Sequence, residues 1–324
     1  MSADKKFPIQ RDGHLYMCEG GTETEFMYKH GFELSHFATF PFLENPKAAS
    51  VLRDMYRSYL DVTARYGMSA IMGGLDYRAS PAWGALLGYS AEGLADANHK
   101  AVDFVKDIAK EYVGQLPEIL INGTIGPRGD AYEANRTITE NEAEDYHSVQ
   151  LNTLKNADVD LVLAMTFNNI PESIGVAKAA AKVGLPLAIS LSLDSSSRLN
   201  TGPSLADAIT TIDAATNGSP DFYMVNCVHP IEYEPALVAG DWIKRVRGIR
   251  PNASKMDKMS LCSLGHLESG DPVELGQQMG DLARRYPHMD IWGGCCGTWD
   301  SHLNEIAKNV LAVQKTSASQ VEVQ

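Results

Sequence analysis

The chain is poor in several features that mark other classes of protein. Only five of its 324 residues are cysteines, an odd and sparse set that does not predict a disulfide framework. No uninterrupted apolar run approaches the length of a membrane span, and the N-terminal segment lacks the apolar stretch of a signal peptide. These absences predict a cytoplasmic protein with no membrane partner.

Basic residues are also scarce. Lysine and arginine total 28 against 41 aspartates and glutamates, which gives a formal net charge of −13 at pH 7. Nucleic-acid binding requires a basic face, so no nucleic-acid partner is expected. The acidic balance is compatible with small cationic ligands. A homo-oligomer is also compatible with the sequence, which does not fix the oligomeric state.

Short apolar runs alternate with amphipathic stretches along the whole chain. The expected strands are residues 15–20, 68–74, 118–127, 159–167, 186–193, 222–227, 247–252 and 289–296. The expected helices are residues 47–67, 91–113, 141–157, 171–184, 204–215, 234–246, 271–287 and 301–314. Continuously apolar strands are typical of a parallel sheet that is covered on both faces.

Eight strand–helix units in this order predict an α/β protein with a single (β/α)₈ TIM barrel over residues 1–314, followed by a polar, frayed tail at 315–324. A doubly wound open sheet is the alternative. It is less favoured because the first unit has no glycine-rich phosphate fingerprint. The longest irregular segments, residues 75–90 and 253–270, are candidate lids.

Three of the cysteines stand at predicted strand ends. Cys227 ends the sixth strand, and Cys295 and Cys296 end the eighth. A barrel of this kind gathers the C-terminal ends of its strands at one mouth, so these three sulfurs are expected to meet. Three protein ligands with one open position are the pattern of a catalytic zinc. The simpler alternative is that Cys295 and Cys296 are buried or joined to each other.

A zinc ion with three thiolate ligands is a weak Lewis acid toward carbonyls, but it binds an incoming thiol and holds it as a thiolate. The sequence therefore predicts Zn²⁺ as cofactor and thiol activation followed by attack on carbon. The partners expected for this chemistry are small molecules, a thiol and an electrophile with a reactive carbon.

Five short motifs carry a resemblance to a known family. They are "EGG" (19–21), "TIGP" (124–127), "VNC" (225–227), "RPNAS" (250–254) and "GGCCGT" (293–298). Over residues 15–312 the chain resembles the zinc-dependent homocysteine S-methyltransferases, which include betaine–homocysteine methyltransferase. The resemblance implies a (β/α)₈ barrel and a zinc ion on the catalytic residues Cys227, Cys295 and Cys296. It also implies methyl transfer to a thiol, with homocysteine giving methionine.

The chain departs from the family where relatives carry a glutamate that holds the ammonium group of homocysteine. Met165 occupies this position, and a thioether cannot neutralise a cation. One explanation is that Glu19, Glu23 or Asp76 binds the ammonium group instead. The other is a different thiol, with an anionic group that pairs with Arg78 or Arg128.

The methyl donor is expected to be an onium compound, because attack of a thiolate on a cation cancels both charges. Betaine, S-methylmethionine or another sulfonium, and S-adenosylmethionine all qualify. Onium groups are recognised by aromatic faces. Tyr77, Trp83, Tyr132 and Trp299 lie on predicted loops, and Tyr77 with Trp299 is the expected donor pocket.

Other residues near these motifs have simpler expected roles. Asn226 is expected to orient a zinc ligand or a substrate carboxylate, and His229 to be a loop histidine rather than a fourth ligand. Thr298 is equally compatible with a helix N-cap. Cys18 and Cys262 are expected to be ordinary buried residues.

Two other functions use the same residues. One is a catabolic demethylase of an onium compound with a different thiol acceptor, and the other is a catalytically weak barrel that binds zinc or an onium. A carboxylate-based barrel hydrolase or lyase is not supported, since no paired acids stand at the strand ends apart from Glu19.

Overall fold

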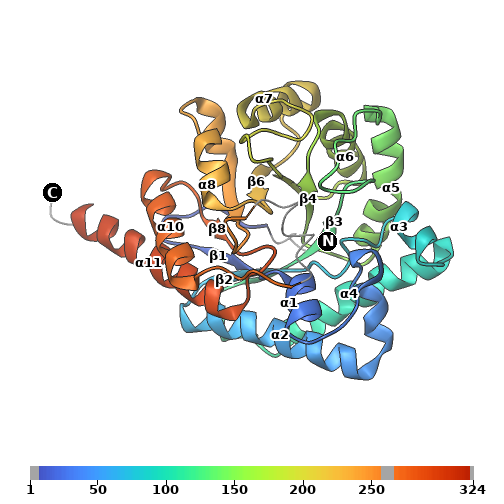
Figure 1. The fold of residues 1–324 in the computed structure, drawn as a ribbon, viewed down its shortest axis with the longest axis horizontal. Helices are drawn as coiled ribbons and strands as arrows, with labels where there is room; N and C mark the ends of the chain where they lie inside the picture. The colour runs from blue at the N-terminus through green and yellow to red at the C-terminus, as the bar shows by residue number, and fades with distance from the viewer. Residues whose placement is uncertain (1–6, 257–265, 322–324) are drawn as a thin grey trace, which may run out of the picture.

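Eight parallel strands close into a barrel in chain order, as expected from the sequence (Figure 1). The computed structural model describes residues 7–256 and 266–321. The strands are β1 (Tyr16–Cys18), β2 (Ser69–Met72), β3 (Ile119–Ile125), β4 (Leu161–Phe167), β5 (Leu187–Leu191), β6 (Phe222–Asn226), β7 (Val246–Arg250) and β8 (Ile291–Trp292). Closure comes from the pairing of β1 with β8, in which Tyr16 stands opposite Ile291. The fold is a (β/α)₈ TIM barrel.

The strands are apolar on both faces because each face meets a different part of the core. Along β4, Leu161, Leu163 and Met165 belong to one buried cluster, which fills the barrel. The alternate residues Val162 and Ala164 belong to a second and larger cluster between the strands and the helices. This two-residue alternation places every second side chain inside the barrel.

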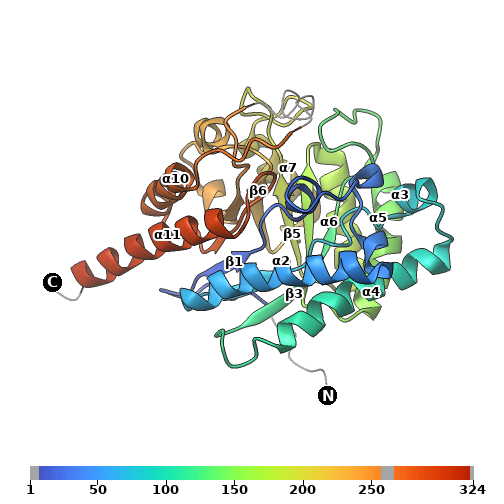
Figure 2. The same cartoon turned by 60° about the horizontal axis from the view of Figure 1, so that its bottom comes forward.

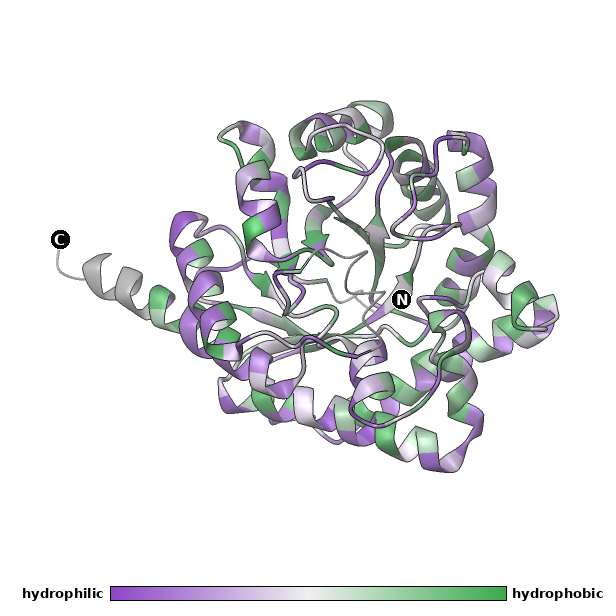
Figure 3. Ribbon diagram, in the orientation of Figure 1, coloured by the Kyte–Doolittle hydropathy of each residue, from purple (hydrophilic) through white to green (hydrophobic). Residues whose placement is uncertain are grey.

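Helices surround the strands on the outside (Figures 1 and 2). The α-helices are α1 (Thr22–Tyr28), α2 (Pro46–Arg65), α3 (Pro81–Leu86), α4 (Ala91–Lys110), α5 (Glu140–Asn156), α6 (Ile170–Val183), α7 (Leu205–Thr216), α8 (Pro230–Tyr233), α10 (Pro272–Arg285) and α11 (Asp300–Val321). The 3₁₀ helices are η1 (Ser35–Phe37), η2 (Phe40–Glu44), η3 (Glu234–Ala236) and η4 (Asp241–Arg245). The outer helices carry green apolar and purple polar residues side by side, as amphipathic helices packed on a barrel do (Figure 3).

Local signals explain several of the helix starts. Thr139 caps α5 with a capping box, in which its hydroxyl accepts from the Glu142 backbone N–H and the Glu142 side chain accepts in return. Asn169 caps α6, and Pro171 lies in its first turn as expected. The last helix packs against α10 and α2 and continues beyond residue 314 to Val321.

The helix expected at residues 234–246 is wrong. The structure has the four-residue α8, then η3 and η4, before β7 begins at Val246. Pro235 stands two residues after the end of α8 at Tyr233 and cannot donate a backbone hydrogen bond to continue the helix. Gly240 precedes η4 with an extended backbone, which separates the two short helices.

Of the two segments expected to be irregular, one contains a helix and the other is only partly described. The candidate lid at 75–90 contains the short helix α3. The candidate lid at 253–270 includes residues 257–265, which lie outside the described part of the chain. Within the described residues, no helix has the length and apolar composition needed to cross a membrane.

Candidate metal centre and substrate cavity

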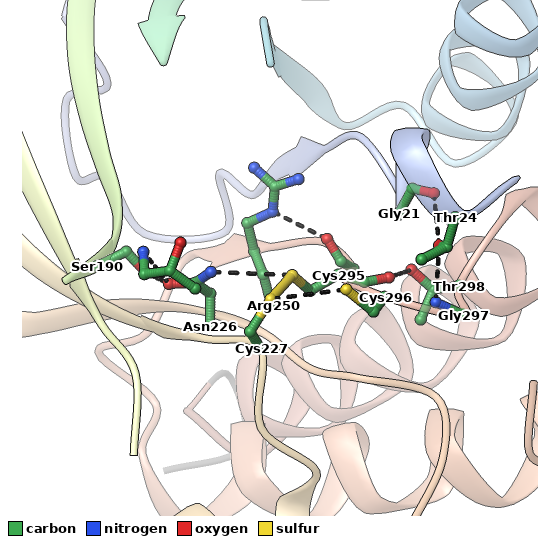
Figure 4. The surroundings of a disulfide bond; sticks show 12 residues. Gly21, Thr24, Ser190, Asn226, Cys227, Arg250, Cys295, Cys296, Gly297 and Thr298 are labelled. Atoms are coloured by element: carbon green, nitrogen blue, oxygen red, sulfur yellow. Dashed lines mark hydrogen bonds between the residues drawn. A yellow bond between two sulfur atoms is a disulfide. The ribbon is translucent and has the colours of Figure 1, made fainter. Parts of the chain in front are cut away.

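Three cysteine sulfurs lie together at the mouth of the barrel. Cys227 follows β6, and Cys295 and Cys296 follow β8 (Figure 4). The three Sγ atoms all lie within 4.8 Å of one another, and those of Cys227 and Cys296 are 3.9 Å apart. The two segments are distant in sequence, but β6 and β8 each pair with β7, which brings their ends to one place. The cluster is half-buried, so a small molecule can reach it.

Cys227 and Cys295 are joined by a disulfide bond, with their Cα atoms 5.4 Å apart. The sequence does not predict a disulfide, and the simpler alternative named there paired Cys295 with Cys296 instead. The physical reason is proximity: sulfurs close enough to share one metal ion are also close enough to bond to each other when they lose two electrons. Metal binding requires the reduced thiolates, so the structure corresponds to the oxidised form of this cluster.

A tight turn brings the two adjacent cysteines to the same site. Gly297 has φ of +81°, and the Thr298 N–H donates to the Cys295 carbonyl at 3.1 Å. The Thr298 hydroxyl donates to the same carbonyl at 2.7 Å, so Thr298 fixes this turn and α11 starts two residues later at Asp300. Gly294 is required because an added Cβ would overlap the Thr298 side chain.

The turn at 295–298 is also tied to neighbouring parts of the rim. The Gly297 N–H donates to the Thr24 hydroxyl of α1 at 3.0 Å, and the Ala253 N–H donates to the Cys296 carbonyl at 3.0 Å. Cys227 itself adopts a left-handed backbone conformation, with φ of +56°. This conformation costs a residue with a Cβ about 1–2 kcal/mol, a strain that often accompanies functional sites.

Asn226 contacts the sulfur cluster with its amide group (Figure 4). Its Oδ1 accepts from the Thr166 N–H at 3.0 Å and from the Ser190 hydroxyl at 2.6 Å. These two donors fix the orientation of the amide, so Nδ2 is directed at Cys295 Sγ, 3.8 Å away. An N–H donor aimed at a sulfur stabilises negative charge on it.

Arg250 is a residue of this rim that the sequence reasoning missed. It ends β7, is 4% exposed, and forms an ion pair with Glu19 through Nη1 and Oε1 at 2.7 Å. Its Nε donates to the Gly294 carbonyl at 3.0 Å and its Nη2 to the Glu19 carbonyl at 3.2 Å. Arg250 thus connects the ends of β1, β7 and β8. The signal in the sequence is an arginine at the end of a strand, directly before Pro251.

A cavity of about 290 Å³ opens beside the sulfurs. Its lining includes all three cysteines of the cluster, Met165 and Asn226. The other sequence-predicted residues on its wall are Glu19, Glu23, Tyr77, Arg78 and Tyr132. The volume and the mixture of apolar walls with a few polar groups are typical of a small-molecule site.

The aromatic residues divide between the cavity and its surroundings. Tyr77 lines the cavity, and its hydroxyl is hydrogen-bonded to that of Thr166 at 2.6 Å. Tyr132 lines it too, with its hydroxyl 3.8 Å from Cys296 Sγ. Trp299 is not part of the wall formed by the described residues, and Lys29 Nζ lies 5.3 Å from its ring centroid. The structure therefore does not assemble Tyr77 and Trp299 into one pocket.

The acidic residues of the rim differ in whether their carboxylates are already bonded to other groups of the protein. Glu19 is paired with Arg250, and its Oε2 is buried with no hydrogen-bond partner among the described residues. Asp76 accepts from the Thr124 N–H through both oxygens, at 3.0 and 3.1 Å, and is not part of the described cavity wall. Glu23, on α1, lines the cavity. Burial raises the pKa of the Glu23 carboxyl to about 7, and burial likewise raises the pKa of Asp76 to about 7.

His229 and Cys18 lie in surroundings that give them structural roles outside the sulfur cluster. His229 caps α8, where its Nδ1 accepts from the Ile231 N–H at 3.3 Å, and burial lowers its pKa to about 4. Cys18 is fully buried at the end of β1, and burial raises the pKa of its thiol to about 12. Neither belongs to the cluster of possible metal ligands found among the described residues. Cys262 lies outside those residues.

The family comparison covers nearly the whole barrel. A family model described as homocysteine S-methyltransferase matches residues 16–310. No curated protein sequence matches the chain.

Solved structures of the homocysteine methyltransferase MmuM from Escherichia coli are similar in fold. The oxidized form has a TM-score of 0.71 at 20% sequence identity, with 92% of this chain and 96% of that chain covered. The metallated form has a TM-score of 0.70 at 19% identity, with 91% and 96% covered. The apo form has a TM-score of 0.63 at 17% identity, with 92% and 96% covered.

Proposed function

Because this chain belongs to the homocysteine S-methyltransferase family, and so is a methyltransferase, we propose that it transfers a methyl group from an onium donor to the sulfur of homocysteine, giving methionine. The observation that carries this proposal is the convergence of three cysteine sulfurs, all within 4.8 Å of one another, on the wall of a substrate-sized cavity. The proposal includes a zinc ion as the group that activates the acceptor thiol.

The donor set fits a catalytic zinc. Sulfurs that surround one ion at about 2.3 Å in a tetrahedral arrangement are separated by somewhat less than 4 Å. The 3.9 Å between the Sγ atoms of Cys227 and Cys296 agrees with this spacing. Cys227, Cys295 and Cys296 would hold the ion once the disulfide is reduced. When bound, zinc lowers the pKa of a fourth, incoming thiol so that it is a thiolate at neutral pH.

The chain's own residues favour the reaction through position and charge. The Asn226 amide, fixed by Thr166 and Ser190, donates toward Cys295 Sγ and so holds that side chain in one orientation. The acceptor sulfur forms a bond to the methyl carbon while the bond from that carbon to the onium nitrogen or sulfur breaks. The electron pair of the broken bond stays with the leaving group, which departs neutral. A cavity with apolar walls favours this loss of two charges.

The charge of the cavity wall supports a cationic donor. Four carboxylates line it: Glu19, Glu23, Asp130 and Glu268. The Glu19 charge is balanced by Arg250. Among the described residues, Glu23, Asp130 and Glu268 then remain against one further arginine of the wall, Arg78. This excess of acidic groups favours entry of an onium compound over that of a neutral or anionic methyl donor. Tyr77 and Tyr132 add aromatic surface to the same wall, and aromatic faces attract onium groups.

Glu23 is the carboxylate best placed to replace the family glutamate. Met165 lines the cavity at the position of that glutamate and has no charge to offer an ammonium group. Asp76 is held by Thr124 away from the wall, and Glu19 is paired with Arg250. Glu23 is on the wall, and its raised pKa reflects a carboxylate whose burial is not offset by its neighbours. An ammonium group beside it would supply that missing charge.

A second candidate function has a specific observation in its favour. The wall at Met165 is apolar, which suits an acceptor thiol without an ammonium group and therefore a catabolic demethylation of the onium donor. The Met165→Glu variant separates the two. Under the main proposal the added carboxylate leaves homocysteine turnover equal or higher, whereas a fall in turnover contradicts an ammonium group at this position.

The proposal is tested by zinc analysis of the reduced protein followed by a matrix of methyl donors and thiols. Betaine, S-methylmethionine, other sulfoniums and S-adenosylmethionine are each combined with homocysteine and with simpler thiols. We expect stoichiometric zinc and methionine formation with at least one donor. A zinc-free reduced protein, or zinc-loaded protein that methylates no thiol, contradicts the proposal.

A further inference from the structure

Arg78 is a buried cation that forms no ion pair with any described residue. It follows β2 and is 7% exposed, and the other two buried arginines of the described chain each have a carboxylate partner: Arg247 pairs with Asp290 and Arg250 with Glu19. Within the described part of the chain, the one hydrogen bond that Arg78 makes is from Nη1 to the Gly129 carbonyl, at 3.3 Å. Its Nε is buried and has no hydrogen-bond partner among the described residues. A buried charge left in this state is costly, so a partner of opposite charge is needed.

Two aromatic rings hold the guanidinium in place. Its Cζ lies 4.1 Å from the ring centroid of Trp83 and 4.9 Å from that of Tyr77. Aromatic contacts of this kind orient a guanidinium but do not neutralise it, and they do not use the N–H groups that are not bonded to Gly129. N–H groups of a guanidinium form strong, charge-assisted hydrogen bonds with a carboxylate.

The position of Arg78 on the cavity wall indicates which kind of molecule pairs with it. Arg78 lines the cavity that also contains Tyr77, Tyr132 and Cys296, so a molecule in this cavity reaches the guanidinium and the sulfur cluster together. We propose that Arg78 recognises a carboxylate group on a substrate of this site and so selects carboxylate-bearing substrates. The assignment rests on the proposed methyl transfer. Homocysteine carries such a group, and so do betaine and S-methylmethionine, so the experiment has one arm for the acceptor and one for the donor.

The first measurement is calorimetric titration of the reduced, zinc-loaded protein, wild type and Arg78→Gln. Homocysteine is compared with 3-aminopropane-1-thiol, and betaine with choline, because each pair differs mainly in the carboxylate. We expect Arg78→Gln to weaken binding of one carboxylate-bearing ligand about 10- to 100-fold and to leave its carboxylate-free analogue unchanged. If homocysteine binding is weakened, the carboxylate belongs to the acceptor. If betaine binding is weakened, it belongs to the donor.

The second measurement is the split between KM and kcat in methyl transfer. We expect Arg78→Gln to raise KM for the same substrate, with a smaller effect on kcat, and Arg78→Lys to recover part of the loss because it keeps the charge but not the fork. Arg128→Gln is the matched control. Arg128, the other arginine considered from the sequence as an anion partner, is exposed and is not on the cavity wall formed by the described residues, and its backbone N–H donates to Glu172.

Two results overturn the assignment. One is an Arg78→Gln protein that binds the carboxylate-bearing and carboxylate-free members of both pairs with wild-type affinity. The other is an equal loss for both members of a pair, which indicates a structural role for the stacked side chain. Failure of the proposed function gives a different result: no turnover with any donor, whatever the titrations show.

Discussion

At the scale of single residues, the three clustered cysteines are expected to bind zinc and the buried Cys18 is not, so the zinc affinities of their variants can be compared. Replacement of Cys227, Cys295 or Cys296 by alanine is expected to weaken zinc binding by more than about 100-fold, since changes to groups that only support a ligand already cost about 10- to 100-fold. Zinc affinity is measured by competition with a chromogenic chelator, and methyl transfer is lost in parallel.

Cys18→Ala is the control for these variants. Cys18 is a buried thiol of the same barrel, and burial raises its pKa to about 12, so it stays protonated and binds no metal. Its replacement is expected to cost about 1 kcal/mol of stability and to leave zinc affinity unchanged. Retention of zinc by the Cys227 variant, or its loss from the Cys18 variant, contradicts the assigned ligands.

Glu23 gives a pH-dependent prediction. Burial raises its pKa in the folded protein to about 7 from an ordinary value of 4.5, while Arg250 and Arg78 oppose the rise and Glu19 adds to it. The folded state therefore holds a proton that the unfolded state releases between these values. Stability falls as pH rises from about 4.5 to about 7, by up to about 3 kcal/mol. Glu23→Gln is expected to remove this fall.

The measurement is the denaturant midpoint of wild type and Glu23→Gln at pH 5 and pH 8. The variant is expected to gain stability over wild type at pH 8 and little at pH 5. Glu33→Gln, at an exposed position just after α1, is the control. An equal effect of Glu23→Gln at both pH values shows that the carboxyl does not ionise in this range.

The sulfur cluster was predictable from the sequence, but the residues that hold it in position were not. The motif around Cys295 and Cys296 is distinctive, and strand ends of a barrel meet at one mouth, so convergence follows from topology. The contacts of Arg250 with Glu19 and Gly294 depend on the distance between β1, β7 and β8, which spacing in the sequence does not encode. For the same reason, the position of Trp299 outside the cavity wall, partly buried against the core, was not predictable from its place beside the motif.

At the scale of elements, long periodic helices were predictable and short ones were not. The amphipathic pattern located α2, α4 and α10 to within a few residues, because a helix that buries one face repeats its apolar residues at helical spacing. The segment 234–246 has similar periodicity, yet Pro235 and Gly240 interrupt it. The helices α1 and α3 are too short for a periodic signal to distinguish them from loops.

The turn after β8 gives a prediction at this scale. Gly294→Ala places a Cβ where the Thr298 side chain lies, and the turn must shift to relieve the overlap. We expect a loss of about 1–3 kcal/mol in stability together with weaker zinc binding, because Cys295 and Cys296 move with the turn. Thermal denaturation and chelator competition measure the two effects.

Gly129→Ala is the matched control on the same rim. An added Cβ there has no heavy atom within 4 Å. This variant is expected to keep the zinc affinity and the stability of the wild type. If Gly294→Ala also keeps both, then the close approach at residue 294 does not determine the position of the cysteines.

At the scale of the whole molecule, barrel closure makes one site from distant parts of the sequence. Pairing of β7 with both β6 and β8 brings the ends of those strands together. Helix α1 adds Glu23 and Thr24 to the same rim. The net charge of −13 and the acidic cavity wall act in the same direction, since both attract a cationic donor. Fold and charge together therefore suit a thiolate nucleophile and an onium electrophile.

The proposed methyl transfer requires three sulfurs to hold one zinc ion with a position left for the acceptor. X-ray absorption at the zinc edge of the reduced, zinc-loaded protein tests this claim directly. We expect three sulfur neighbours at about 2.3 Å, and a fourth after addition of homocysteine. A site already closed by four protein ligands, or one whose sulfur count does not change when homocysteine is added, contradicts the account.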